Sequence, residues 1–314
     1  MRIEPYEEEV KNKYWKCVET FIDSKKQQEI LESCRNYLPP AFFSQNASFR
    51  ELVLAPYAKL KEAYQYMEKN KSRMEEECFK KDANGKFVRN SRGKLVRMQL
   101  YEDLFHTYGK VSQKMFDDVV KMNVFLVQQT GLTVCPYCNR DYINCRSEKL
   151  AGAQLDHFFP RSRYPIFSVC LYNLVPVCGN CNHIKLDDMQ EFASPFDEEI
   201  DWEHDVQFSY ELLDLDRKKI VIHARGPIKQ NIDKMQIEAA YQIHEMEVNE
   251  LLDKVKMYSQ TQLEEYEKVF AEMGLSEQEL KQMVFGKKIT EDNFRKKPLG
   301  RMMRDLEKEL KIYK

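Results

Sequence analysis

Four cysteines stand in two closely spaced pairs, Cys135 with Cys138 and Cys178 with Cys181. A two-residue gap lets both thiolates of a pair reach one ion, and two such pairs complete the tetrahedral sulfur shell that suits Zn2+. A closed shell leaves no position for a substrate, so the predicted zinc is structural. Two redox-active dithiols, or four buried thiols without a metal, are the alternative interpretations of the same pattern.

Polar residues and short apolar runs lie between and after these pairs, in the segments AQLDHFFP, NLVPVC and GNCNHIKLD. The first segment predicts a short strand that ends at Asp156 and His157. The second predicts an apolar strand beginning at Asn173, and the third predicts the start of a helix. Strand, loop, strand and helix make a ββα arrangement, which the zinc would clamp.

The order Asp-His, then Asn, then CxxCNxxK resembles the HNH endonuclease family in its zinc-clamped form, with His157, Asn173 and Asn182 at the three signature positions. The resemblance implies an endonuclease that hydrolyses phosphodiester bonds of nucleic acid, DNA rather than RNA. It makes His157 the general base, a task that suits an imidazole. It implies Mg2+ or Mn2+ on oxygen atoms of Asp156 and Asn182, and a purely architectural Asn173. His183, directly after Asn182, is the alternative ligand.

Three basic residues near this motif are candidate nucleic-acid contacts. Arg161 and Arg163 lie between the two predicted strands, and a guanidinium group suits phosphate oxygens. Lys185 lies one helical turn beyond Asn182 and is a further candidate. The alternative is that all three side chains are simply solvated.

The stretch from about residue 130 to 200 is similar to the HNH nuclease subunits of bacterial anti-phage systems such as Septu, which act with an ATPase of the ABC/SMC type, sometimes alongside a retron. This implies an ATPase partner, since the chain has no phosphate-binding loop of the GxxxxGK[ST] kind. Two alternatives stay open. One is a restriction or mobile-element HNH nuclease that needs no ATPase, and the other is a non-catalytic zinc-stabilised module that binds nucleic acid or protein.

The composition limits the class of protein. With 314 residues, 43% of them hydrophobic, and only 10 Gly and 11 Pro, the chain is expected to be globular and rich in helix. Its net charge of −2 excludes a uniformly basic DNA-coating protein, so any binding of nucleic acid is local or shared with a partner. No apolar run approaches a membrane span and no signal core opens the chain, so we expect a cytoplasmic protein with no membrane partner.

The predicted architecture is mainly α, with a small ββα-metal nuclease core stapled by the four-cysteine zinc site. Three regions are expected: helices with a basic hairpin-like excursion over 1–130, the zinc-bearing HNH core over 131–200, and a β-hairpin with helices over 201–314. No internal repeat is apparent. Apolar periodicity and turn residues predict individual helices over 6–36, 56–81, 98–108, 112–130 and 228–269, and an amphipathic helix in the tail 285–314.

The segment 79–97 stands apart from these helices because seven of its residues are Lys or Arg and one is Asp. Asn84-Gly85 and Arg92-Gly93 punctuate it as turns. It is a candidate nucleic-acid contact, and a solvated loop is the alternative.

Overall fold

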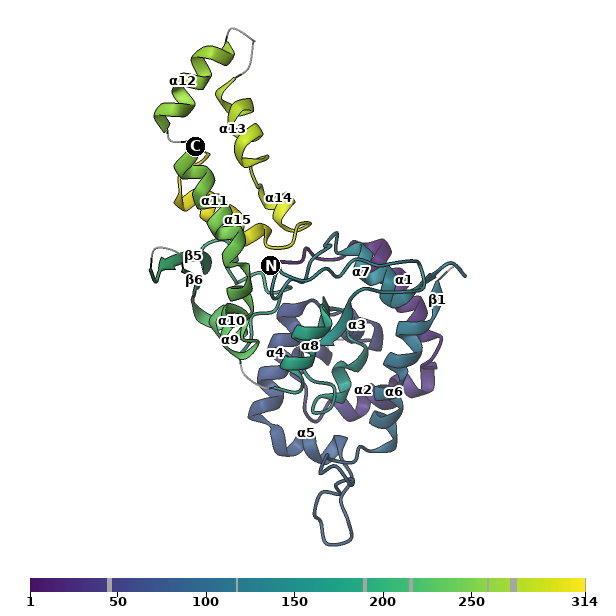
Figure 1. The fold of residues 1–314 in the computed structure, drawn as a ribbon. Coiled ribbons are helices and arrows are strands. Elements are labelled where there is room, and N and C mark those ends of the chain that lie inside the picture. Colours follow the sequence, from purple (N-terminus) through teal and green to yellow (C-terminus); the bar gives the residue numbers. More distant parts are fainter. Residues whose placement is uncertain are drawn as a thin grey trace.

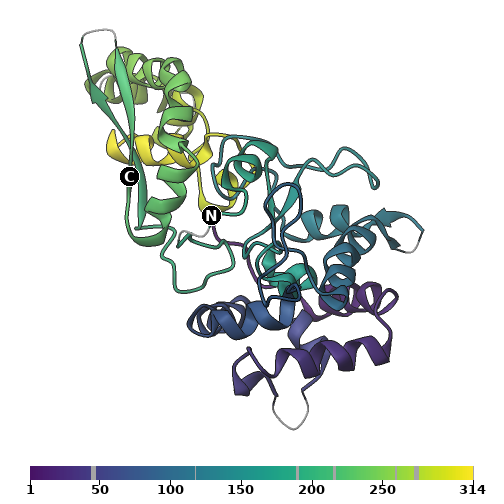
Figure 2. The same cartoon turned by 90° about the horizontal axis from the view of Figure 1, so that it is seen from below.

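The protein is mainly helical, as the sequence predicts, with 51% helix and 12% strand. The first two thirds of the chain form one body, and the segments after about residue 205 form a second group of elements beside it (Figures 1 and 2). No helix in the part of the chain that the structure describes is long and apolar enough to cross a membrane. The computed structural model describes residues 1–43, 47–116, 118–188, 191–214, 217–258, 260–271 and 276–313.

The N-terminal helices pack through apolar stripes at helical spacing. In α1 (Glu8–Glu19), Val10, Tyr14, Cys17 and Val18 are buried, the i, i+4, i+7, i+8 pattern of a helix with one face in the core. The remaining elements of this layer are α2 (Ser24–Cys34), η1 (Pro40–Phe43), α3 (Phe49–Val53), α4 (Tyr57–Lys69), α5 (Lys71–Cys78) and α6 (Gln99–Gln113).

Two long helices of the prediction are each broken in two. The helix expected over 6–36 is interrupted because Asp23 caps α2, its side chain accepting a hydrogen bond from the Lys26 N–H at 2.9 Å. The helix expected over 56–81 is divided at Asn70, whose backbone (φ −114°, ψ 32°) leaves the helical region.

The helix predicted over 112–130 is wrong in its first half. Instead α6 continues to Gln113, and β1 (Met115–Phe116) pairs antiparallel with β2 (Val120–Lys121) before α7 (Met122–Gln129) begins. The chain then leaves the helix at Gly131, where the φ of 64° favours glycine. This stop agrees with the prediction.

Residues 79–97, here called the basic excursion, form a meander that projects from the end of α5 (Figure 1). Antiparallel bridges join Phe79 to Arg97, Lys81 to Phe87 and Arg89 to Leu95. The segment therefore has the predicted hairpin-like form, with turns at both predicted positions.

The two turns of the basic excursion have similar sequences in tandem, DANGKFVR from Asp82 and NSRGKLVR from Asn90. In each copy the first side chain accepts hydrogen bonds from the N–H groups two and four residues further on, at 2.9 to 3.0 Å. Gly85 and Gly93 then take left-handed φ values of 76° and 72°. The expectation that the chain holds no internal repeat was therefore wrong.

The segment that carries the cysteine pairs has the predicted order of strand, loop, strand and helix. β3 (Gln154–His157) pairs antiparallel with β4 (Leu174–Val177), so that His157 lies opposite Leu174 and Gln154 opposite Val177. Two 3-10 turns, η2 (Pro165–Val169) and η3 (Leu171–Asn173), fill the loop, and α8 (Gly179–Lys185) follows β4.

The C-terminal group begins with the predicted hairpin, in which β5 (Val206–Leu212) pairs with β6 (Lys218–Ala224). Residues 215 and 216 of its predicted turn lie outside the described residues. The long helices expected over 228–269 and 285–314 are instead series of shorter ones. These are α9 (Gly226–Lys234), α10 (Ile237–Tyr241), η4 (Gln242–His244), α11 (Glu245–Met257), α12 (Gln260–Ala271), α13 (Glu277–Phe285), α14 (Glu291–Phe294) and α15 (Gly300–Glu309).

The C-terminal group is anchored to the first cysteine pair. The side chain of Asn139 donates to the Phe294 carbonyl at 2.9 Å and accepts from the Arg301 N–H at 2.8 Å, and the Tyr241 hydroxyl donates to the Cys138 carbonyl at 2.7 Å. Asn139 is left-handed, with a φ of 51°, a conformation that asparagine tolerates. Helices distant in sequence thus hold the loop that carries the predicted zinc ligands.

Candidate metal centre and active site

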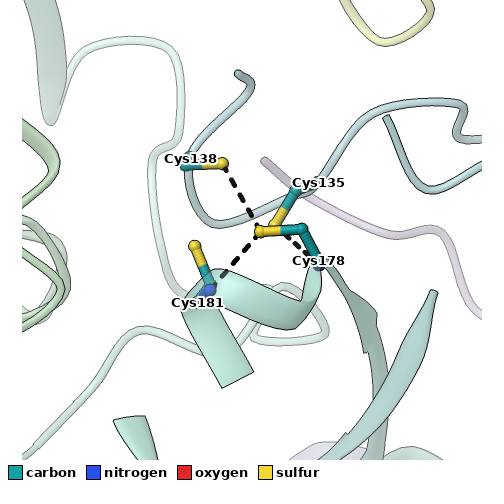
Figure 3. A group of neighbouring side chains, drawn as sticks. All are labelled: Cys135, Cys138, Cys178 and Cys181. Atoms are coloured by element: carbon teal, nitrogen blue, oxygen red, sulfur yellow. Dashed lines mark hydrogen bonds between the residues drawn. The ribbon is translucent and has the colours of Figure 1, made fainter. Parts of the chain in front are cut away.

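The four cysteines of the two pairs meet in one buried cluster. Their sulfur atoms all lie within 4.8 Å of one another, and Cys138 Sγ is 4.0 Å from Cys178 Sγ. Figure 3 shows them between the loop of Cys135 and Cys138 and the start of α8. Four thiolates at about 2.3 Å from a tetrahedral zinc need this kind of spacing. The cluster can therefore hold a metal ion such as zinc, and no disulfide links these residues.

Backbone N–H groups point at the sulfur atoms, as thiolates require. The N–H of Cys178 lies 3.4 Å from Cys135 Sγ, and that of Cys181 lies 3.4 Å from Cys178 Sγ. Hydrogen bonds to the other three sulfurs raise the pKa of the Cys181 thiol well above its usual range. Four deprotonated sulfurs at this distance need the compensating charge of a cation.

His157 lies at the end of β3 with its ring orientation fixed. Its Nε2 is 3.0 Å from the carbonyl oxygen of Ser168, and a carbonyl only accepts, so Nε2 carries the proton and Nδ1 is the basic atom. The Tyr108 ring contacts the imidazole edge to face at a centroid distance of 4.4 Å. The arrangement leaves one defined nitrogen able to accept a proton.

Burial lowers the pKa of His157 to about 3, and the positive charges of Arg161 and Lys185 act in the same direction, against the hydrogen bond to Ser168. This differs from the ordinary imidazole that the sequence led us to expect. The ring is neutral at physiological pH, and a phosphate anion placed beside it would offset the two cations and raise its basicity.

Asn173 makes the backbone hydrogen bonds expected of an architectural residue. Its Oδ1 accepts from the Phe159 N–H at 2.7 Å, and its Nδ2 donates to the carbonyls of Phe159 and Phe167 at 3.1 and 3.0 Å. The side chain is fully buried. Because Phe159 follows His157 by two residues, these bonds fix the chain that leaves the histidine.

Asp156 and Lys185 form a buried ion pair. Lys185 Nζ lies 3.1 Å from Asp156 Oδ1 and 3.0 Å from its Oδ2, and it also donates to the Phe158 carbonyl at 3.1 Å. The lysine side chain is 0% exposed. The prediction that Lys185 contacts a phosphate is therefore wrong, because α8 turns this residue toward β3 and not toward solvent.

Asn182 faces β3 from the same side of α8. Its Nδ2 donates to Gln154 Oε1 at 2.6 Å, which leaves the side-chain oxygen Oδ1 without a hydrogen bond to any described residue. Gln154 and Asp156 are two apart on β3, and Asn182 and Lys185 are three apart on α8. The two side-chain pairs therefore lie along one strand–helix contact.

A cavity of about 340 Å³ opens beside this contact. Four of the predicted site residues border it, namely Asp156, His157, Arg161 and Asn182. His183, the alternative ligand, borders it too, so both candidates reach the cavity, and Asn182 alone is held against β3. The other lining residues are Tyr108, Gln154, Leu155, Pro160, Gly179, Leu186 and Asp187.

The two predicted arginine contacts have different environments. Arg161 is partly buried, lies over the rings of Phe105 and Tyr108 at 4.1 and 4.8 Å, and donates to the Phe105 carbonyl at 3.0 Å. Arg163 is exposed and lines a neighbouring cavity. Arg161 thus borders the His157 cavity with its guanidinium fixed by these contacts, whereas the guanidinium of Arg163 is accessible to solvent.

A hard cation beside the cysteine cluster would have two predicted ligands in this cavity, Asp156 and Asn182. Among the described residues the four cysteines are the only group of three or more His, Cys, Asp or Glu side chains able to share an ion. A second ion would therefore take oxygen from Asp156 and Asn182 and keep several waters, which suits Mg2+. Lys185 and Tyr137 leave Asp156 Oδ1 one further lone pair for such a bond.

Three residues of the site were missed from the sequence. Tyr137 donates to Asp156 Oδ2 at 2.8 Å and stands inside the first CxxC pair. Gln154 shares a strand face with Asp156, so the alternation of β3 was a usable signal. Tyr108 comes from α6, and nothing in the sequence connects it with His157.

Comparison with known proteins returns no match: no protein-family model, no curated protein and no solved structure corresponds to this chain. The resemblance to HNH nucleases accordingly rests on the motif residues alone and stays a prediction.

Proposed function

We propose that this protein is a metal-dependent endonuclease of the HNH type that hydrolyses phosphodiester bonds of DNA. The observation that carries the proposal is the environment of His157, a neutral imidazole with its Nε2 proton committed to the Ser168 carbonyl. Such a ring offers Nδ1 to a water molecule in the cavity beside it. The zinc cluster is structural in this proposal, because four sulfur ligands leave no open position.

In the proposed reaction Nδ1 of His157 takes a proton from the attacking water. Asn173 and the Ser168 carbonyl keep the ring from turning, so the nitrogen stays aimed at one point. Arg161, positively charged at the rim of the same cavity, stabilises the phosphate that enters. These are tasks of the chain's own side chains.

The catalytic Mg2+ or Mn2+ would be held by Asp156 and Asn182. When bound, such an ion supplies charge stabilisation at the phosphate and at the departing oxygen. Lys185 and Tyr137 act as positioning residues for the Asp156 carboxylate. Holding that carboxylate in one orientation is their contribution to the site.

The same contacts favour a second candidate function. Asp156 is 3% exposed and its oxygens already accept from Lys185 and Tyr137, an environment that also suits a purely structural carboxylate. A non-catalytic zinc-stabilised module would keep every one of these contacts. It differs from the nuclease in needing neither the free Nδ1 of His157 nor a second metal.

We further propose that the nuclease acts with an ABC/SMC-type ATPase in anti-phage defence. The motif residues within 130–200, which resemble those of nuclease subunits in such systems, are one reason for this proposal. Exposed apolar side chains in the C-terminal group, among them Leu212, Ile243 and Met246, at 69%, 71% and 65% exposure, offer a surface for a protein partner. Co-purification with an ATPase encoded beside the gene tests the pairing.

Supercoiled plasmid tests the nuclease directly. Wild-type protein should nick it with Mg2+ or Mn2+ and not in metal-free buffer, and His157→Ala should not nick it at all. His223→Ala is the matched control, since His223 is an exposed histidine on β6. Equal nicking by His157→Ala and wild type would refute the assignment of the base, and no nicking by any protein, with or without the ATPase, would favour the non-catalytic module.

A further inference from the structure

A second cavity, of about 410 Å³, lies next to the one that holds His157. Its walls come from α5, the basic excursion and the turn at residues 162–164, and Asp187 lines both cavities. Lys94 Nζ of the excursion lies 3.2 Å from Asp187 Oδ2. The two cavities therefore adjoin, with the second turn of the excursion at their boundary.

The second cavity, here called the basic groove, concentrates positive charge in a protein whose net charge is −2. Five basic and two acidic side chains line it. They are Lys71, Arg89, Lys94, Arg97 and Arg163 against Glu75 and Asp187. A local excess of cations beside the proposed active site attracts a polyanion and guides its approach.

Three of these cations are available to bind a ligand: Lys71 and two guanidinium groups, those of Arg89 and Arg163. Arg89 and Arg163 are exposed and form no ion pair with any residue that the structure describes, although Arg89 Nη1 donates to the Gly93 carbonyl at 2.7 Å. Lys94 and Arg97, by contrast, are paired with Asp187 and Glu102 at 3.2 and 3.0 Å. The unpaired guanidinium groups retain donors suited to phosphate oxygens.

A continuous row of contacts fixes the groove relative to His157. Arg97 of the excursion lies over the Phe105 ring at 3.7 Å, and Arg161 lies over the same ring at 4.1 Å. Arg161 also lies over Tyr108, whose ring contacts His157. Since each cation–ring contact restrains its neighbours, the base of the excursion is held at a set distance from the candidate base.

We propose that the basic groove binds the sugar–phosphate backbone of DNA and leads it to the His157 cavity. This inference rests on the proposed nuclease function and names the path of its substrate. The tandem repeat serves the groove by placing Arg89 and Lys94 on neighbouring arms of one meander, where both line it. Contacts of this kind read phosphates and not bases, so binding is independent of sequence.

The test is binding of a short fluorescein-labelled DNA duplex, followed by anisotropy, to the full chain carrying His157→Ala. That background prevents cleavage, so binding is read whether or not the protein is a nuclease. The groove variant adds Arg89→Gln and Arg163→Gln. The matched control adds Lys86→Gln and Arg92→Gln, which remove equal charge from exposed residues of the same excursion that do not line the groove.

The groove variant should bind tens of fold more weakly at about 0.1 M salt, and the slope of log affinity against log salt should fall by about 1.8, which is about 0.9 for each lost phosphate contact. The control should keep the wild-type slope. Any of three results would refute the proposal that the groove binds DNA. These are equal weakening of binding in both variants, no change in either variant, and no binding of duplex DNA by the protein that carries His157→Ala alone. Loss of cleavage in His157→Ala bears on the nuclease and leaves this result untouched.

Discussion

The buried pair of Lys185 and Asp156 makes the sharpest prediction about stability. In Lys185→Met the side chain keeps its length and loses its charge, so the Asp156 carboxylate stays buried with only Tyr137 as a donor. Removing one partner of a buried ion pair costs about 3 to 5 kcal/mol. Spread over the unfolding entropy of a chain of this length, that loss lowers the melting temperature by roughly 5 to 8 °C.

Thermal melts of four proteins measure this effect: wild type, Lys185→Met, Asp156→Asn, and the double variant. The double variant buries no charge, so it should recover at least about 2 kcal/mol relative to the sum of the single losses. Lys86→Met is the matched control at an exposed lysine and should change stability by less than about 0.5 kcal/mol. A Lys185→Met protein that melts with the wild type, or strictly additive losses, would show that the pair is not buried as described.

Three further predictions concern the residues around this pair. Asn173→Ala removes three hydrogen bonds to buried backbone and should cost about 2 to 3 kcal/mol in chemical denaturation, whereas a loss below about 0.5 kcal/mol would contradict its role. Cys178→Ala should release the metal, read as zinc content, and make the segment of β3 and α8 sensitive to protease; undiminished zinc would exclude the cluster. Folding lowers the pKa of His157 from its ordinary value of 6.5 to about 3, so the unfolded chain binds the extra proton and stability should fall as pH drops from about 6.5 toward 3. The slope contributed is at most about 1.4 kcal/mol per pH unit, and it should vanish in His157→Gln.

The parts of the fold that the sequence predicted are those decided by local pattern. Such patterns depend on neighbours in the chain: the two CxxC pairs, the apolar run before Cys178 and the alternation in residues 206–224. The structure contains the cysteine cluster and the antiparallel pairs β3–β4 and β5–β6 that these patterns predicted. Helix boundaries were less well predicted. Asp23 and Asn70 interrupt helices whose apolar periodicity continues on both sides, and periodicity alone does not reveal such a break.

The site shows the same division between local and distant causes. The bonds of Asn173 follow from its place between the strands, whereas the burial of Lys185 depends on which face of α8 meets β3, a matter of tertiary packing. The contact of Tyr108 with His157 joins α6 to β3, and no spacing rule relates residues so far apart. The eight-residue repeat of the basic excursion was visible in the sequence and was missed because it occurs only twice.

The measurement that tests the central claim most directly compares metal-dependent nicking of plasmid by the wild-type protein and by His157→Ala. The variant should match the wild type in zinc content and melting temperature, so that the cysteine cluster and the fold are intact. The account predicts wild-type nicking with Mg2+ or Mn2+ and none by this variant. Nicking at the wild-type rate by a correctly folded, zinc-loaded His157→Ala protein would contradict it.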